Sequence, residues 1–212
     1  ESNLAIVGLS RPKCGYAKLA IGGGPEYFSM ENDTPITTGA ASDEGSLYLG
    51  HSNGGISEIT GEGSSSHKAG SASVTSITIG EDWLAGLESG TVLSGPSLGS
   101  WSAEVGGLVD AVGLGPSLRG ERCVWSSSWS ERAKLSLLDE ISGDIQFEVS
   151  HDSRIGKICS AGRTITLGDS EGNIFLIEEG VLRRRFEQVE EGFGADQKRS
   201  LIRSRIRRLQ KR

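Results

Sequence analysis

The sequence repeats one short pattern, in which two glycines flank three mostly polar residues between two apolar runs. The pattern occurs at residues 50–54, 86–90 and 168–172. A tight glycine-containing turn between short apolar runs is typical of a β-hairpin. Glycine supplies 31 of the 212 residues, about twice its usual share, and its spacing has no collagen-like period. The glycines therefore indicate turns in an all-β protein built from repeated hairpins.

The spacing of the hairpins gives the size of the repeat. Gly50 and Gly86 lie 36 residues apart, and Gly86 and Gly168 lie 82 apart, which is two steps of 41. The midpoint of the longer gap, Ser127, again lies where an apolar run meets a polar turn, and a step of 42 back from Gly50 reaches Gly8. A period of about 40 residues is that of a four-stranded propeller blade.

Each repeat also contains segments that fit the other strands of a blade. Alternating polarity, which predicts strands with one buried face, precedes the later hairpins at residues 36–40, 74–79, 109–114 and 155–159. More polar candidates for outer strands lie at residues 26–30, 100–105, 144–149 and 181–186. In the second repeat, residues 61–67 have the composition of a loop.

The predicted fold is all-β, a β-propeller of about five four-stranded blades over residues 1–187. The first blade lacks its innermost strand, so the chain forms either a five-bladed ring or part of a larger ring. We expect the latter, because the sequence begins within a blade and without a Met. Residues 188–212 are predicted to form a linker and a basic amphipathic helical tail.

Two segments resemble the WD-repeat family. Residues 133–145 look like the end of such a repeat, with Leu138 where the signature tryptophan would precede Asp139. Residues 168–174 are similar to the glycine-bracketed hairpin of that family, with Glu171 in place of its Asp. At the level of the propeller superfamily, the resemblance extends over about residues 1–187.

Two histidines and a second family add to this resemblance. His67 and His151 lie roughly where WD-type repeats place a histidine, and residues 161–172 are also similar to quinoprotein-type propeller repeats. The WD type implies a platform that binds proteins. The quinoprotein type implies an enzyme that needs calcium-binding and quinone-stacking residues, and the sequence provides no convincing set of these.

The sequence predicts no catalytic, cofactor or metal site. The three histidines (51, 67 and 151) are far apart, and neither a Cys-x-x-Cys nor a Gly-x-Ser-x-Gly motif occurs. Carboxylate pairs at residues 139–140 and 178–179 are expected on solvated hairpins. We therefore predict a protein that is not an enzyme and that uses no cofactor.

The cysteines and the hydropathy bear on the compartment. Cys14, Cys123 and Cys159 are odd in number and widely separated, which favours buried free thiols in a reducing intracellular compartment, cytoplasmic or nuclear, with export to an oxidising compartment as the alternative. No apolar run approaches the ~18 residues of a transmembrane helix, and the oligomeric state is not predicted.

The four tryptophans divide into two pairs. Trp83 and Trp125 lie in apolar runs and are expected in the core, whereas Trp101 and Trp129 lie among serines and polar residues and are expected at the surface. Exposed aromatic side chains are typical interface anchors. Trp129 is therefore a candidate contact for a partner.

The charge is divided along the chain. Residues 197–212 contain eight basic residues and no acid, so the net charge of −6 is the sum of an acidic body at −14 and a tail at +8. Ile202, Ile206 and Leu209 follow helical spacing on one face of this tail. The candidate binding residues on the tail are Arg203, Arg207, Arg208 and Lys211.

These observations predict a non-enzymatic scaffold that binds protein partners through its propeller loops. The tail is expected to add a salt-sensitive second contact to an acidic surface of this molecule or of a partner. Two other surfaces remain as alternatives for the tail, nucleic acid and an anionic membrane, as does a solvated terminus that binds nothing. A nucleic-acid-associated factor and a quinoprotein-like enzyme remain as alternative functions.

Overall fold

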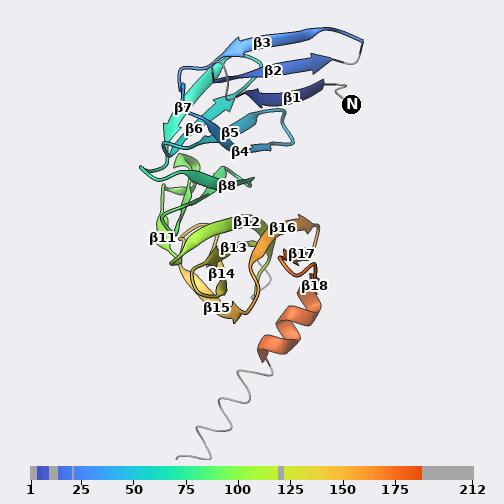
Figure 1. Cartoon of the computed structure of the whole chain (residues 1–212). Coiled ribbons are helices and arrows are strands. Elements are labelled where there is room, and N and C mark those ends of the chain that lie inside the picture. The colour runs from blue at the N-terminus through green and yellow to red at the C-terminus, as the bar shows by residue number, and fades with distance from the viewer. Residues whose placement is uncertain (1–3, 10–13, 21, 119–121, 188–212) are drawn as a thin grey trace, which may run out of the picture.

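Antiparallel β-sheets dominate the computed structural model, which describes residues 4–9, 14–20, 22–118 and 122–187 (Figure 1). The described residues form five sheets, numbered here in chain order. The strands are β1 (Leu4–Leu9), β2 (Gly15–Ala20) and β3 (Pro25–Ser29) in the first sheet; β4 (Ile36–Ala41), β5 (Leu47–His51), β6 (Gly55–Ile59) and β7 (Ser64–Lys68) in the second; β8 (Val74–Ile79), β9 (Trp83–Leu87), β10 (Thr91–Ser94) and β11 (Ser102–Glu104) in the third; β12 (Leu108–Pro116), β13 (Arg122–Trp129), β14 (Ala133–Asp139) and β15 (Ile145–His151) in the fourth; and β16 (Ile155–Ala161), β17 (Thr164–Asp169) and β18 (Ile174–Glu178) in the fifth. A 3₁₀ helix, η1 (Pro96–Leu98), lies between β10 and β11.

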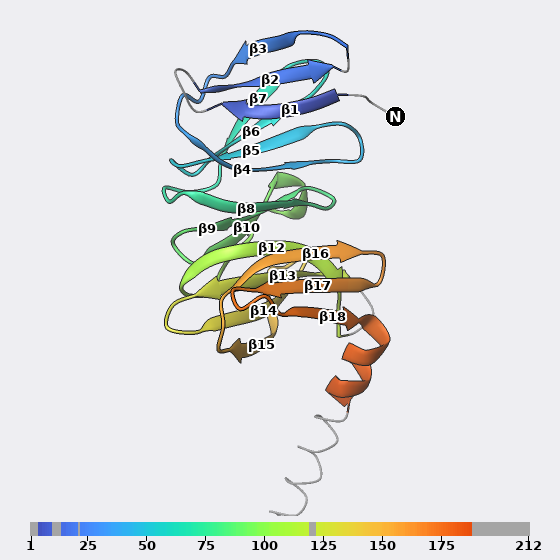
Figure 2. The ribbon, with the colours of Figure 1, turned by 45° about the vertical axis from the view of Figure 1, so that its right-hand side comes forward.

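The strands of every sheet are neighbours in chain order, so each sheet is a meander of hairpins. The first strands of the second to fifth sheets, β4, β8, β12 and β16, contact one another in succession and form the inner side of an arc. The first sheet lies at one end of this arc, and the fourth and fifth sheets lie toward the other end (Figures 1 and 2). Within the described residues, no ladder joins the first sheet to the fifth.

The predicted hairpin positions recur at one place in each sheet. Gly50, Gly86, Ser127 and Gly168 all lie in the second strand of their sheets, β5, β9, β13 and β17. Gly8 lies in β1, so β1 corresponds to a second strand and the described part of the first sheet has no strand on its inner side.

Two local predictions are wrong. Residues 61–67 were expected to form a loop, but they contain most of β7, because Ser64–Lys68 pair in antiparallel register with β6. Residues 181–186 were expected to form an outer strand, but they lie in a helix over residues 179–187. The fifth sheet therefore has three described strands, and the helix follows them.

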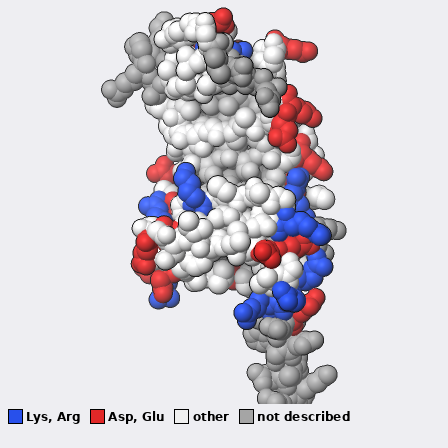
Figure 3. Space-filling view, turned by 90° about the vertical axis from the view of Figure 1, so that its right-hand side faces the viewer, with Lys and Arg blue, Asp and Glu red and all other residues white. Residues whose placement is uncertain are grey.

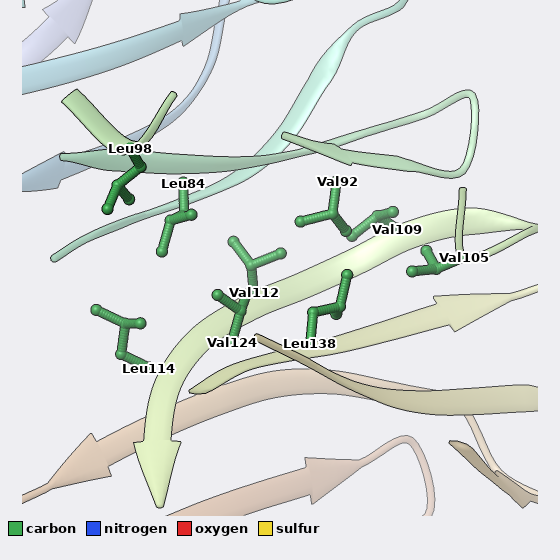
Figure 4. Packing of buried hydrophobic residues seen from close by; sticks show 9 residues of the cluster. All are labelled: Leu84, Val92, Leu98, Val105, Val109, Val112, Leu114, Val124 and Leu138. Atoms are coloured by element: carbon green, nitrogen blue, oxygen red, sulfur yellow. The ribbon is translucent and has the colours of Figure 1, made fainter. Parts of the chain in front are cut away.

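Packing between consecutive sheets forms the core. The cluster between the third and fourth sheets is the largest aliphatic one, and its residues point toward one another from β9, β10, β12, β13, β14 and the nearby loops (Figure 4). Its members are Leu84, Val92, Leu98, Val105, Val109, Val112, Leu114, Val124 and Leu138. Full burial of such a side chain contributes about 1.5–3 kcal/mol, so these contacts between sheets stabilise the arc.

A small residue in each second strand allows the next sheet to approach closely. A Cβ added to Gly50 would lie 2.7 Å from Val74 Cγ1, and one added to Gly86 would lie 3.0 Å from Val109 Cβ. Val74 and Val109 lie at the start of the inner strands of the following sheets. Side chains at the two glycine positions would therefore overlap the neighbouring sheet.

The helix over residues 179–187 packs on the fourth and fifth sheets. Leu182 and Phe186 contact the buried cluster between these sheets, and the rings of Phe186 and Phe147 meet edge to face with centroids 6.2 Å apart. Glu179 at the first turn and Arg183 one turn later form an ion pair at i,i+4 spacing, which favours a helix. The helix thus packs apolar side chains against the cluster between the fourth and fifth sheets.

Candidate functional site

A cavity of about 490 Å³ lies on one rim of the arc, where the inner strands of the second to fifth sheets end. We call it the rim cavity. The residues around it come from the β4–β5 turn, the ends of β8, β12 and β16, the start of β13, the β16–β17 turn and the start of the helix over residues 179–187. They are Asp43, Ile79, Leu114, Gly115, Pro116, Arg122, Ser160, Gly162, Arg163 and Glu179.

Arg122 is held at this rim by a buried carboxylate. Its Nε donates to Glu140 Oε2 at 2.7 Å and its Nη2 donates to Glu140 Oε1 at 2.6 Å. The side chain of Glu140 is only 9% exposed, whereas that of Arg122 is 49% exposed. The hydrogen bonds to Glu140 raise the pKa of Arg122 above its usual value, so this guanidinium carries a permanent charge in a fixed orientation.

Arg163 repeats this arrangement in the fifth sheet. Its Nε lies 2.6 Å from Glu179 Oε2, and Glu179 also accepts a hydrogen bond from Arg183. The side chain of Glu179 is 10% exposed and that of Arg163 is 81% exposed. Each arginine has five N–H donors, so Arg122 and Arg163 both retain N–H groups that a ligand in the cavity can use.

The two arginine pairs occupy equivalent places in consecutive hairpins. Arg122 and Glu140 lie directly beyond the last paired residues of β13 and β14, Cys123 and Asp139. In the fifth sheet, Arg163 and Glu179 lie directly beyond the pair of Thr164 and Glu178. The cavity is therefore lined by the same arrangement twice: a cross-strand ion pair in which the carboxylate is buried and the arginine is exposed.

The prediction that both carboxylate pairs lie on solvated hairpins is wrong for one member of each pair. Glu140 and Glu179 are buried, because the arginine opposite each one on the neighbouring strand compensates its charge. An arginine and a glutamate placed symmetrically about a predicted hairpin turn are the sequence signal that could have found them.

The groups around the rim cavity form hydrogen bonds and ion pairs. Three acids, Asp43, Glu140 and Glu179, face three arginines here. Arg122 pairs with Glu140, and Arg163 and Arg183 both pair with Glu179. Ser160 is the one hydroxyl among the lining residues, which include neither histidine nor cysteine. This composition suits recognition of carbonyl and carboxylate groups of a polypeptide.

A third arginine pair provides a comparison on the same arc. Arg154 donates from Nε to Asp110 Oδ2 at 2.8 Å and from Nη2 to Asp110 Oδ1 at 2.6 Å. Its side chain is 46% exposed. Arg154 precedes β16, at the end opposite to the β16–β17 turn, and it does not line the rim cavity.

Each of the three histidines has protein partners. The ring of His51 is buried between the Thr34 carbonyl, 3.0 Å from Nδ1, and Ser57 Oγ, 2.9 Å from Nε2. Because a carbonyl only accepts, Nδ1 of His51 carries the proton and Nε2 accepts from Ser57. His67 contacts Glu58 at 3.2 Å. Among the described residues, no group of three or more potential metal ligands comes together.

His151, the last residue of β15 in the fourth sheet, contacts the β17–β18 hairpin of the fifth sheet. Its Nε2 lies 3.1 Å from Asp169 Oδ2. Asp169 also accepts hydrogen bonds from the side chain of Asn173 and from the backbone N–H groups of Glu171 and Asn173. Led by the side-chain bond from Asn173, these bonds lower the pKa of Asp169 from 3.8 to about 2. Asp169 therefore stays ionised and fixes the turn.

The tryptophan predictions are confirmed for the core pair, since Trp83 and Trp125 are buried. The expectation of surface positions for the other two is only partly met. Trp101 is partly buried and donates from Nε1 to the Glu140 carbonyl at 2.9 Å, and Trp129 packs partly buried against the cluster of the fourth and fifth sheets. The role of Trp129 in binding a partner stays a prediction.

The predicted tail residues Arg203, Arg207, Arg208 and Lys211 lie outside the described residues, as does the whole of residues 188–212. Among the cysteines, Cys14 and Cys123 are buried, but Cys159 is exposed. The expectation of three buried thiols is therefore wrong for Cys159. No helix in the described part of the chain is long and apolar enough to cross a membrane.

Charge is unevenly distributed over the arc. Among the described residues up to Gly80 there are seven acids and two lysines. On the face seen in Figure 3, red side chains line the half that carries the first two sheets, and most blue side chains lie over the half with the fourth and fifth sheets. The arginines of the rim cavity belong to this second half.

The comparisons with known proteins support the fold. No family model and no curated protein match the chain. Among solved structures, a chain in the crystal structure of the mitotic checkpoint complex resembles it with a TM-score of 0.66 and 15% identity, over 85% of this chain and 59% of that one. The computationally designed Ika4 protein resembles it with a TM-score of 0.57 and 18% identity, over 74% of this chain and 99% of that one. The fold is thus all-β and propeller-like, as the repeat spacing predicts.

Proposed function

We propose that this protein is a non-enzymatic interaction module that binds a polypeptide segment of a partner in the rim cavity. The observation that carries this proposal is the pair of exposed arginines, Arg122 and Arg163, each oriented by a buried glutamate at the same cavity. Guanidinium groups fixed in this way bind carbonyl and carboxylate oxygens with little loss of side-chain entropy. The similarity to a chain of a protein complex agrees with such a role.

The test compares two arginines that have the same geometry and nearly the same exposure. A displayed library of random peptides is selected on the immobilised chain, and the selected peptides are then measured on the variants Arg122→Ala and Arg154→Ala. Both changes leave a buried carboxylate without its partner, so their effects on folding match and the thermal midpoints of the two variants check this. Of these two arginines, only Arg122 lines the cavity.

The expected result is at least a tenfold loss of peptide affinity in Arg122→Ala and no loss in Arg154→Ala. A hydrogen bond to a charged group contributes about 1.5–3 kcal/mol, and each 1.4 kcal/mol corresponds to about a tenfold change in affinity. The proposal fails if the library yields no binder, or if both variants bind the selected peptides equally.

We further propose that residues 197–212 provide a second, salt-sensitive contact to an acidic surface. The support is their eight basic residues without an acid. Deleting residues 197–212 is expected to weaken partner binding at low salt and to remove most of its salt dependence. If duplex DNA binds the whole chain and not the shortened one, with affinity that falls steeply with salt, the nucleic-acid alternative is favoured instead.

The repeats themselves are proposed to be of the WD type rather than the quinoprotein type. His151 contacts Asp169 in the glycine-bracketed hairpin, and this is the segment whose sequence resembles WD repeats. Retention of calcium or a quinone by the purified protein would support the quinoprotein-like enzyme and contradict this assignment.

A further inference from the structure

The fifth sheet has one face that no described part of the chain covers. Ile165 and Leu167 of β17 point toward the fourth sheet and are buried. The alternate residues of β17 and their cross-strand partners form the opposite face, which we call the open face. Its members are Lys157, Cys159, Thr166, Gly168, Ile174 and Leu176.

The open face is unusually apolar for a surface of this protein. Ile174 and Leu176 are 75% and 64% exposed, the largest values among the aliphatic residues of the fifth sheet. Cys159 is also exposed. On the second to fourth sheets, the corresponding face is buried against the next sheet.

Between consecutive sheets, the contact that buries the corresponding face takes the same form each time. The small residue of each second strand receives the first part of the next inner strand, with Gly8 against Ile36, Gly50 against Val74 and Gly86 against Val109. In the fourth sheet, Ser127 donates to the Ile155 carbonyl at 2.8 Å. The residue received is Val or Ile each time, and each lies at the first or second position of its strand.

Gly168 is the fifth member of this series, and its space is open. A Cβ added to Gly168 would meet only the Lys157 Cβ, at 3.8 Å. The hairpin register places Ile174 directly across from Gly168, and Leu176 lies two residues further along the same strand. The space above Gly168 therefore matches the space that receives a Val or Ile side chain at each internal interface, and apolar side chains lie beside it. We call this space the socket.

We propose that the open face binds a β-strand of a partner polypeptide that begins with Val or Ile, with this side chain seated on Gly168. Continuity with the four internal interfaces gives the chemistry of the occupant. A second copy of this chain does not offer such a strand at its own uncovered end. That end is the first sheet, which has no inner strand among the described residues. This surface is separate from the rim cavity and does not depend on the proposed function.

The probe for this proposal is a strand that the chain already uses. A synthetic peptide of residues 72–80, which contains Val74, is added to the full, isotopically labelled chain, and the binding site is read from backbone amide shifts. We expect the shifts to change at Thr166, Gly168, Ile174 and Leu176. The same peptide with Val74→Asp is expected to bind at least tenfold more weakly.

The matched protein variant is Gly168→Val. The φ angle of Gly168 is not in the left-handed region and the space around it is open, so the fold is retained while the socket is filled. Peptide affinity is expected to fall at least tenfold. Equal affinity for this variant, or shifts confined to other surfaces, would overturn the proposal.

Two further results would overturn it by identifying another occupant. Self-association without peptide, measured by sedimentation and lost in Gly168→Val, would identify a second copy. If deletion of residues 188–212 alone changes the shifts of Gly168 and Ile174, the chain covers this face itself.

Discussion

Replacing Gly86 by Ala tests whether close approach at these glycines holds consecutive sheets together. The added Cβ would overlap Val109 Cγ1 and would lie 3.0 Å from Val109 Cβ and 3.3 Å from Val112 Cγ1. A rotamer change moves Val109 Cγ1 but not Val109 Cβ, which is bonded directly to the backbone, so the 3.0 Å contact remains. Overpacking of this kind costs about 1–3 kcal/mol, or about 2–12 °C in thermal midpoint for a chain of this size.

Gly168→Ala is the control, because it adds the same methyl group at the equivalent position where the space is open. Removing a glycine from a strand is expected to stabilise this variant by up to about 0.5–1 kcal/mol. Urea unfolding, followed by the fluorescence of the buried Trp83 and Trp125, measures both variants. If Gly86→Ala is as stable as Gly168→Ala, the close-approach argument is refuted.

A double-mutant cycle identifies the partner. Val109→Ala alone leaves a cavity and destabilises the chain. If the overlap with Val109 is the cause, Gly86→Ala costs less in the Val109→Ala background than in the original chain, and the coupling energy differs from zero by more than about 0.5 kcal/mol. Additive effects would show that the cost of Gly86→Ala arises elsewhere.

Two further predictions concern acid and thiol chemistry. Because the pKa of Asp169 is lowered from 3.8 to about 2, its contribution to stability is present above about pH 4 and is lost as the pH falls through 2. Thermal midpoints measured from pH 5 to pH 2 are therefore expected to fall less steeply in Asp169→Asn, and equal slopes would contradict this. For the thiols, burial raises the pKa of Cys123 to about 12, and Cys14 is also buried. Iodoacetamide is expected to label Cys159 alone in the native protein and all three cysteines in urea, as mass spectrometry would report.

The sequence pattern predicted the hairpins well because their signals are local. A glycine-bracketed turn between apolar runs depends on residues within about ten positions, so β5, β9 and β17 lie where the pattern indicated. The period of about 40 residues then followed from three such hairpins.

The errors occurred where contacts between distant segments decide the structure. The segment that became β7 is mostly serine, and hydrogen bonds to β6 rather than its own residues make it a strand. Residues 181–186 lie where the repeat places an outer strand, but Leu182 and Phe186 are one helical turn apart, and their packing on the fourth and fifth sheets selects the helix.

The candidate site was missed for a related reason. Arg122 and Glu140 are 18 positions apart, and they meet only when the hairpin of β13 and β14 has formed in the correct register. Composition suggested that Glu140 would be solvated, because isolated carboxylates are rarely buried. The arginine that makes burial possible is visible only once the strands are paired.

The arc has a consequence for the way in which this protein loses its structure. Within the described residues, the buried clusters lie between consecutive sheets, so stability is approximately a sum of nearest-neighbour terms, as in a one-dimensional chain of coupled units. The third and fourth sheets have a neighbour on both sides and share the cluster that contains Leu84, Val109 and Leu138. The first and fifth sheets have one described neighbour each. Opening therefore begins at the ends of the arc and moves inward, and amide protons of the central sheets exchange with solvent last.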